Sequence, residues 1–447
     1  MKIVIVGAGN VGLASAEAAV RNNDVLVIEK DSAKAEIAKN TLPVSVLKED
    51  GSNPKTLKNA IERINADVVL SAVPDDGANL FICMLAKQIK PTVQTVACIR
   101  NPDYLSGENG MAGVDLLISP ETIAADKILH LALMENAVSY DDLRVQDLCL
   151  VTYRVERDHD LVGKVLMTTD LPQNCFVVAI YRGDETLLNV STTEFHAGDR
   201  VCVLATHEGA IEFNKLIGIT REAREFVILG AGPIGLTVAR ALTADPKKRF
   251  VKIIESDLAK CQEAARQLSD AIVVHGDIVD PLILQSERVD RADVIITVSS
   301  HDERNLLASL AAMRFGIPKI ITRYTTKEYD KIFKYIGLES IVGYHKVIIN
   351  EIRKYLNAEE SAVIVMEQPG DFFFRINADE STPLVDQYLG DLNLPGGVRI
   401  AAVVRGNQVI FPTLSTKFEK GDRIMLYAHD ADPSQLSRVL GHQTPEL

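Results

Sequence analysis

The fold is decided by the stretch KIVIVGAGNVG, residues 2–12. An apolar, β-branched run at 2–6 passes through three glycines into residues 13–20, which are compatible with a helix. Such a run is typical of a buried parallel strand, and the glycines let backbone N–H groups approach a pyrophosphate at the positive end of the following helix. We therefore expect a nucleotide-binding turn whose contacts come from Gly7, Ala8, Gly9, Asn10, Val11 and Gly12.

The same order of strand, glycine turn and helix recurs as EFVILGAGPIG at residues 225–235. Its three glycines match those of the first copy at an offset of 223 (230 − 7). A second nucleotide turn is therefore predicted, with contacts from Gly230, Ala231, Gly232, Pro233, Ile234 and Gly235. Because Pro233 stands where the first copy has Asn10, one backbone donor is lost, and the two sites are expected to differ in affinity or preferred nucleotide.

An acidic residue follows each turn at the end of the next apolar run. Glu29 lies 20 positions after Gly9 (29 − 9), and Glu255 closes the corresponding run of the second copy. This spacing suits a carboxylate that accepts hydrogen bonds from a ribose diol and repels a 2′-phosphate. The adenosine end of the ligand is therefore expected to be that of NAD or ATP rather than NADP.

Further apolar runs, at residues 44–47, 66–73 and 95–99, complete a parallel sheet. Ligands bind across the carboxyl ends of such strands, where these ends meet at one edge of the sheet. The first crevice is expected to include Asp50, Gly51, Val73, Pro74 and Arg100, and the second Asp277, Ile278, Ser299 and Arg323. Arg100 and Arg323 share the 223 offset, and each is either a phosphate or partner contact or an ordinary surface arginine.

The duplication extends beyond the nucleotide units. Residues 121–137 have a helical pattern in which apolar side chains occupy more than one face of the helix. This helix is therefore expected to pack against another subunit or domain. From residue 142 short β-rich runs follow, and their Gly198-Asp199-Arg200 recurs as Gly421-Asp422-Arg423. The prediction is an α/β protein with two Rossmann-type parallel-sheet domains, each followed by a small α+β domain. Its parts are residues 1–124 (first Rossmann-type domain), 125–141 (linking helix), 142–223 (first small domain), 224–343 (second Rossmann-type domain), 344–360 (linking helix) and 361–447 (second small domain).

Composition excludes several classes of partner. With a net charge of −13 and a pI near 5.3, nonspecific attraction to nucleic acid or anionic lipid is not expected. No uninterrupted apolar run is long enough to span a membrane, and glycines break the weak resemblance of the N-terminus to a secretory signal. The six cysteines are scattered without a CxxC pair and are expected to be reduced core residues of a cytosolic protein. The nine histidines show no metal-ligand spacing.

These features resemble the RCK, or TrkA-type, regulators of potassium transport, in which a Rossmann nucleotide-binding module precedes a small TrkA-C module. The resemblance covers nearly the whole chain. It is carried by the turn at 7–12 with Glu29, the loop GDIVDP at 276–281, the DERN sequence at 302–305 and Gly198-Asp199-Arg200. The sequence departs from the family at Glu49-Asp50-Gly51-Ser52, where Gly-Asp-Ala-Thr is usual, and at Cys98, where some members have arginine.

The resemblance implies a regulatory protein that breaks no bond. Its ligands would be NAD (NAD+ or NADH), ATP or ADP, and it would be a homo-oligomer, dimer or tetramer. The implied partner is a TrkH-like membrane potassium channel subunit, which the protein would gate from the cytoplasmic face of the membrane. Two alternatives remain open: an NAD-dependent dehydrogenase, which needs a general acid or base beside the nicotinamide, and a flavoprotein.

Overall fold

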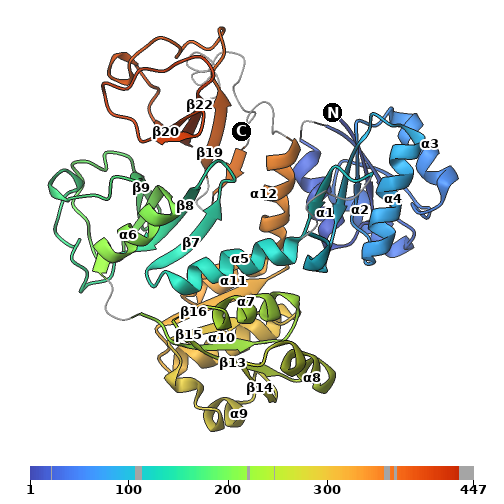
Figure 1. The fold of residues 1–447 in the computed structure, drawn as a ribbon, viewed down its shortest axis with the longest axis horizontal. Coiled ribbons are helices and arrows are strands. Elements are labelled where there is room, and N and C mark those ends of the chain that lie inside the picture. The colour runs from blue at the N-terminus through green and yellow to red at the C-terminus, as the bar shows by residue number, and fades with distance from the viewer. Residues whose placement is uncertain are drawn as a thin grey trace.

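The structure is a computed structural model, and it describes residues 1–21, 23–105, 113–218, 222–245, 247–356, 363–366 and 370–431. It contains two parallel sheets and two smaller antiparallel sheets, in the order parallel, antiparallel, parallel, antiparallel along the chain (Figure 1). This confirms the predicted fold class.

The first Rossmann domain is a six-stranded parallel sheet in the order β3-β2-β1-β4-β5-β6. Its β-branched strands are buried on both faces by helices, as expected for a parallel sheet. Its elements are β1 (Lys2–Val6), α1 (Asn10–Ala19), β2 (Asp24–Ile28), α2 (Ser32–Thr41), β3 (Ser45–Leu47), α3 (Pro54–Ile64), β4 (Val68–Ser71), α4 (Asp76–Ile89), β5 (Gln94–Cys98) and β6 (Leu116–Ile118).

The second Rossmann domain repeats this topology in the order β14-β13-β12-β15-β16-β17. Its elements are β12 (Glu225–Leu229), α7 (Pro233–Thr243), β13 (Phe250–Glu255), α8 (Leu258–Gln267), β14 (Ile272–His275), α9 (Pro281–Ser286), β15 (Val294–Thr297), α10 (Asp302–Arg314), β16 (Lys319–Tyr324), α11 (Tyr329–Tyr335) and β17 (Ser340–Gly343). In both domains the first strand lies at the centre of the sheet, so the glycine turn that follows it opens at the point where the strand order reverses.

Each small domain contains a five-stranded antiparallel sheet. The first, ordered β10-β9-β11-β8-β7, consists of β7 (Ala137–Asp142), β8 (Leu148–Arg154), β9 (Cys175–Arg182), β10 (Glu185–Leu187) and β11 (Arg200–Thr206), and is followed by α6 (His207–Gly218). The second, ordered β18-β19-β22-β20-β21, consists of β18 (Val363–Val365), β19 (Asp371–Asn377), β20 (Val398–Arg405), β21 (Gln408–Ile410) and β22 (Arg423–His429). Short 3₁₀ helices lie at Pro102–Leu105, Leu166–Thr168, Val289–Arg291 and Leu389–Asp391.

The linking segments differ from their predicted bounds. A helix, α5, spans Pro120–Leu133, and β7 then joins the antiparallel sheet, so the predicted linking segment 125–141 is helix in its first part and strand in its last. The second linking helix, α12, spans Tyr344–Leu356. Residues 357–360 of its predicted range lie outside the described residues, as do residues 432–447 of the second small domain.

The two linking helices exchange partners between the halves of the chain. Helix α5 leaves the first Rossmann domain and packs against α7 of the second, whereas α12 leaves the second domain and packs against α1 of the first (Figure 1). The expected packing of the first linking helix against another domain is therefore observed. One buried apolar cluster runs through both Rossmann domains and the first small domain, so the halves share a core.

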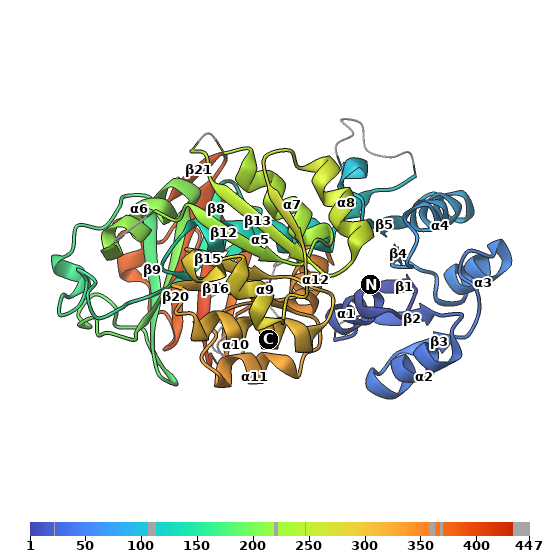
Figure 2. The ribbon, with the colours of Figure 1, turned by 90° about the horizontal axis from the view of Figure 1, so that it is seen from below.

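The two small sheets pack against each other. A second buried cluster combines strands β8, β9 and β11 with β19, β20 and β22. At this junction Arg399 donates to the carbonyl oxygens of Val177 (3.0 Å) and Val178 (2.5 Å). Figure 2 shows the small domains at one end of the molecule and the first Rossmann domain at the other. Among the described residues, no helix is both long and apolar enough to cross a bilayer.

Candidate nucleotide site

The first glycine turn joins β1 to α1, and its three glycines have different physical roles. Gly7 has a φ of +99°, and a Cβ there would lie 2.8 Å from the Ala72 carbonyl oxygen. A Cβ on Gly12 would lie 1.9 Å from the Gly7 carbonyl oxygen, so this glycine lets the helix approach the strand. A Cβ on Gly9 would meet nothing within 4 Å. Packing therefore does not require a glycine at position 9, whereas close approach of a ligand would.

Glu29, at the end of β2, holds this turn in place. The residue is only 8% exposed, and its Oε2 accepts a 2.6 Å hydrogen bond from the Ala8 N–H. Its Oε1 accepts a 2.8 Å bond from the N–H of Asp31, which in turn caps α2. Each carboxylate oxygen has a further lone pair, so Glu29 can accept from a ribose hydroxyl while it orients the turn.

A cleft of about 700 Å³ opens beside the turn and gathers most of the residues predicted for the first crevice. The predicted residues that line it are Gly7, Gly9, Asn10, Val11, Glu29, Asp50, Gly51, Val73, Pro74 and Arg100. Ala8 and Gly12 are buried in the turn and do not line the cleft. Asp50 closes its own loop by accepting from the Ser52 N–H (2.9 Å) and hydroxyl (2.7 Å), and these two bonds lower its carboxyl pKa.

The same cleft is completed by the second half of the chain. Arg323, at the end of β16, and Tyr344, the first residue of α12, both line it. The guanidinium lies 4.7 Å from the Tyr344 ring centroid and donates to the Ser299 carbonyl oxygen (3.0 Å). Its Nε is buried and finds no hydrogen-bond partner among the described residues, and burial lowers the pKa of the group. A cation with a spare donor therefore stands at the wall of the first cleft.

Arg323 was predicted for the second crevice, and it bonds the carbonyl oxygen of Ser299 there, but it also lines the first cleft. The strand registers pair Ser71 with Ala97 in the first sheet and Thr297 with Thr322 in the second. The residues that follow, Cys98 and Arg323, each offer their carbonyl oxygen to a helix asparagine, Asn79 or Asn305. Arg323 therefore corresponds to Cys98. The 223 offset that it shares with Arg100 does not mark equivalent positions, because the segments between the turns differ in length.

Tyr344, Pro120 and Glu121 also line the cleft, although the sequence analysis did not assign them to it. Pro120 and Glu121 begin α5 directly after β6 of the first Rossmann domain. Tyr344 begins α12 and reaches the cleft from the second half because α12 packs against α1. Burial and the neighbouring Glu121 raise the pKa of Tyr344, and burial raises that of Cys98. No spacing pattern in the sequence indicates such a contact between the halves.

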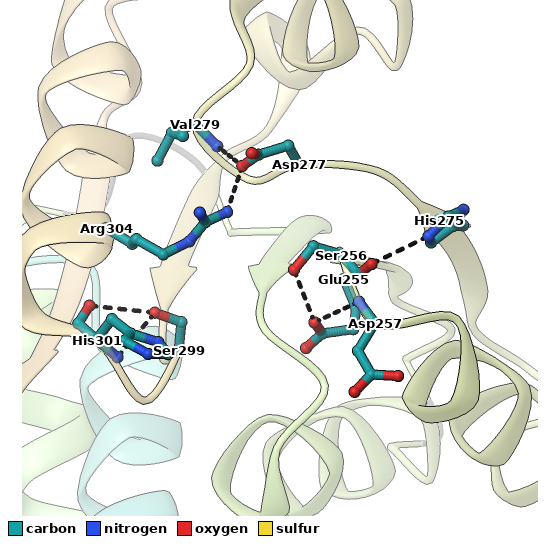
Figure 3. Close-up of polar contacts among 9 residues, drawn as sticks. All are labelled: Glu255, Ser256, Asp257, His275, Asp277, Val279, Ser299, His301 and Arg304. Carbon is teal, nitrogen blue, oxygen red and sulfur yellow. Dashed lines mark hydrogen bonds and ion pairs between the residues drawn. The ribbon is translucent and has the colours of Figure 1, made fainter.

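In the second site, as in the first, a buried glutamate at the end of a strand binds the backbone of the glycine turn. Glu255 is 8% exposed, and it accepts from the N–H of Ala231 (2.8 Å). It also accepts from the N–H of Asp257 (2.9 Å), as Figure 3 shows. Burial acts to raise the pKa of this carboxyl, but the two backbone bonds outweigh it and the pKa is lowered. A Cβ on Gly232, as on Gly9, would meet nothing within 4 Å. Pro233 is the exposed first residue of α7.

The remaining residues predicted for the second site lie in or beside this turn and on the neighbouring loops. Gly230, Ala231, Ile234, Gly235 and Ile278 are buried. Ser299 follows β15, and its N–H donates to the Asn305 side chain (2.9 Å). Asp277 follows β14, accepts from the Val279 N–H (3.0 Å) and forms an ion pair with Arg304 of α10 (Figure 3).

Comparison with protein families matches both kinds of domain twice. The TrkA-N domain model matches residues 3–120 and 226–344, and the TrkA-C domain model matches residues 150–218 and 373–441. The chain belongs to the TrkA-N/TrkA-C family. This tandem TrkA-N/TrkA-C order is the duplication that the sequence analysis predicted.

Relatives share the tandem TrkA-N/TrkA-C chain over nearly its full length. The Trk system potassium uptake protein TrkA homolog 1 of Methanosarcina mazei is 28% identical, over 98% of this chain and 99% of its own. The TrkA homolog of Archaeoglobus fulgidus is 30% identical, over 96% and 97%. Among solved structures, the GsuK RCK domain has a TM-score of 0.65 at 18% identity, covering 98% of this chain and 94% of that one. The GsuK channel bound to NAD has a TM-score of 0.64 at 18% identity, covering 98% and 78%.

Proposed function

We propose that this chain is a nucleotide-sensing regulatory subunit of a potassium transporter. It binds NAD+, NADH, ATP or ADP in the first cleft and gates a TrkH-like membrane subunit by changing how its two halves pack. The observation that carries the proposal is that the cleft beside the glycine turn has walls from both halves of the chain. A ligand in such a cleft acts on the packing of the halves through its different affinity for the two arrangements.

The nucleotide class follows from the chemistry of the cleft. The open space at Gly9 admits a phosphate at the N-terminus of α1, and Glu29 offers its remaining acceptors to a ribose diol. Asp50 and Gly51 stand at the end of β3, where an adenine would lie. The GsuK structures bound to NAD and to ADP carry the same fold, which supports this choice of ligand.

The potassium-transport role is supported by the relatives, which are named as Trk system potassium uptake proteins. The assembly, a dimer or tetramer on the cytoplasmic face of the membrane, is proposed on the same grounds. The GsuK channel contains the same fold, and this is consistent with a role of the present chain beside a channel.

A regulatory role fits the cleft better than a dehydrogenase does. Tyr344 and Cys98 are the acids lining the cleft that are neutral near pH 7. The pKa of each is raised by burial, so neither donates a proton readily near neutral pH. We expect no NAD-dependent turnover, and steady oxidation of NADH with a small carbonyl substrate would contradict the proposal. Purified protein is also expected to lack flavin colour and fluorescence.

The test uses a matched pair of variants. Gly9 and Gly232 are the N-cap residues of α1 and α7, where aspartate is favoured, and each has open space for a side chain. Gly9→Asp and Gly232→Asp should therefore fold and place a carboxylate where a phosphate would bind. Calorimetric titration of the four nucleotides should show a tight binding site that is lost in Gly9→Asp and kept in Gly232→Asp. Absence of binding by the wild-type protein, or equal binding by both variants, would overturn the proposal. A Gly9→Asp protein should also lose nucleotide control of potassium flux when reconstituted with the membrane subunit.

A further inference from the structure

Arg304 occupies a position in the second site that has no charged counterpart in the first. Asn79 and Asn305 are equivalent, since each clamps the loop after the fourth strand of its sheet, to Val73 in one half and Ser299 in the other. The preceding residues, Ala78 and Arg304, are therefore also equivalent. Ala78 is one of the residues that line the first cleft. The second site has a guanidinium where the first has only a methyl group.

This guanidinium reaches from the first turn of α10 to Asp277 in the loop after β14. Figure 3 shows Arg304 extending from α10 to Asp277, with Glu255 and Asp257 on the neighbouring strand end. The Asp277 Oδ1 that pairs with Arg304 also accepts from the Val279 N–H (3.0 Å). In the first half the corresponding aspartate, Asp50, is satisfied within its own loop by Ser52, and no arginine reaches it among the described contacts.

We propose that the Arg304–Asp277 pair is a latch across the adenine end of the second site, which makes this site the weaker of two nucleotide sensors. The inference rests on the proposed function, because it assumes that the glycine turns bind adenine nucleotides. Arg304 competes with a base for Asp277, because the guanidinium neutralises the carboxylate and occupies the space beside its Oδ1. The second site therefore fills at higher nucleotide concentration than the first.

The exposure of the pair sets the strength of the latch. The Arg304 and Asp277 side chains are 33% and 45% exposed, so water screens their attraction. Pairs of this kind contribute up to about 1 kcal/mol, which corresponds to a factor of roughly five in affinity. A latch of this strength raises the nucleotide concentration at which the second site fills, but it does not prevent binding. The loss of one backbone donor at Pro233 acts in the same direction.

The latch is tested with the first site blocked. In a Gly9→Asp background, calorimetry should show that Arg304→Met binds ADP or NAD+ roughly fivefold more tightly than the protein with Arg304, because methionine keeps the bulk of the side chain and removes its charge. The mirror variant, Ala78→Arg in the wild-type background, should weaken the first site. Circular dichroism confirms that each variant is folded.

The outcomes separate this inference from the proposed function. Equal or weaker binding after Arg304→Met overturns the latch, while a tight site that is present in the wild type and lost in Gly9→Asp would leave the proposed function intact. No binding by any of these proteins overturns both. Tighter binding after Arg304→Met supports the latch.

Discussion

Arg323 is the residue that most directly ties the two halves of the chain to one ligand. It leaves the end of β16 in the second Rossmann domain, bonds the Ser299 carbonyl beside the second site, and lines the first cleft. Its spare Nε donor is the feature that a phosphate would satisfy. The residue thus joins the loop after β15 to the wall of the first cleft, and it uses different nitrogen atoms on the two sides.

Replacement of Arg323 by glutamine should weaken nucleotide binding at the first cleft. A hydrogen bond from a charged group contributes about 1.5–3 kcal/mol, so the expected loss of affinity is roughly ten- to a hundredfold. Calorimetry on the Gly232→Asp background measures this site alone. Arg314→Gln, an exposed change on α10, is the matched control. Unchanged affinity in Arg323→Gln would show that the guanidinium does not reach the ligand.

Lys319, at the start of β16, is a buried cation outside both sites. Its Nζ donates to the carbonyl oxygens of Met134 (3.2 Å), Glu135 (3.1 Å) and Ala137, at the junction of α5 and β7. Burial lowers the pKa of this amine to about 7, although Glu135 and Glu339 act to raise it. A neutral amine still donates two hydrogens, so the junction keeps hydrogen bonds above that pH.

The stability of the protein should therefore depend on the protonation of Lys319. Between about pH 7 and 10 the unfolded chain holds a proton that the folded chain has released, so the free energy of unfolding gains up to about 1.4 kcal/mol per pH unit from this residue. Urea unfolding at pH 7, 8 and 9 should show that Lys319→Met lacks this contribution. The buried cysteines, whose pKa values are raised, act in the opposite direction in both proteins and cancel in the difference. A difference between the two proteins that is constant with pH would contradict the prediction.

At the scale of elements, the repeated Gly-Asp-Arg turn has an explanation that the sequence did not reveal. The aspartate of each copy is buried, and it binds an arginine from another strand rather than the arginine beside it. Asp199 binds Arg182 of β9, and Asp422 binds Arg405 of β20, each through Nε and Nη2. Each carboxylate also accepts the N–H of the residue three positions earlier. The turn thus holds one strand of the small sheet against the loop that precedes another strand of that sheet.

Replacement of Asp422 by asparagine should destabilise the second small domain strongly. The carboxylate is fully buried and bonds both Arg405 and the Glu419 N–H, so its loss should cost about 1–3 kcal/mol, although Arg405 is partly exposed and keeps its ion pair with Glu419. Asp199→Asn should have a similar effect in the first small domain. Asp184→Asn, an exposed change in the turn between β9 and β10, should stay within about 0.5 kcal/mol of the wild type. Chemical denaturation measures all three, and a loss below 1 kcal/mol in Asp422→Asn would contradict this role.

At the scale of the whole molecule, the exchange of linking helices joins two halves that the sequence presents in series. The glycine turns, the acidic strand ends and the long repeat were enough to predict both Rossmann domains and the small domain after each. They were not enough to predict which half α5 and α12 contact. A repeat shows that two segments are similar in sequence, but it does not show which segments are neighbours in space. For the same reason Arg323 and Tyr344 were missed as residues of the first cleft.

The shared core predicts that the halves unfold together. Ile352 of α12 is 1% exposed and lies in the cluster that runs through both Rossmann domains. Ile352→Ala should lower the free energy of unfolding by about 2–5 kcal/mol while the transition remains single. The control is Ile332→Ala on α11, where the side chain is 42% exposed and little should change. Two separate transitions in calorimetric scans would show that the halves are independent.

The reciprocal packing of α5 and α12 also has a consequence for how such a protein can evolve. Two identical chains that exchanged these helices would carry every mutation twice, once in each site, and would keep their symmetry. A single chain that contains both copies inherits each mutation in one place only. Pro233 opposite Asn10 and Arg304 opposite Ala78 are differences of this kind. Two copies in one chain can thus keep the reciprocal packing of α5 and α12 while their glycine turns diverge in sequence.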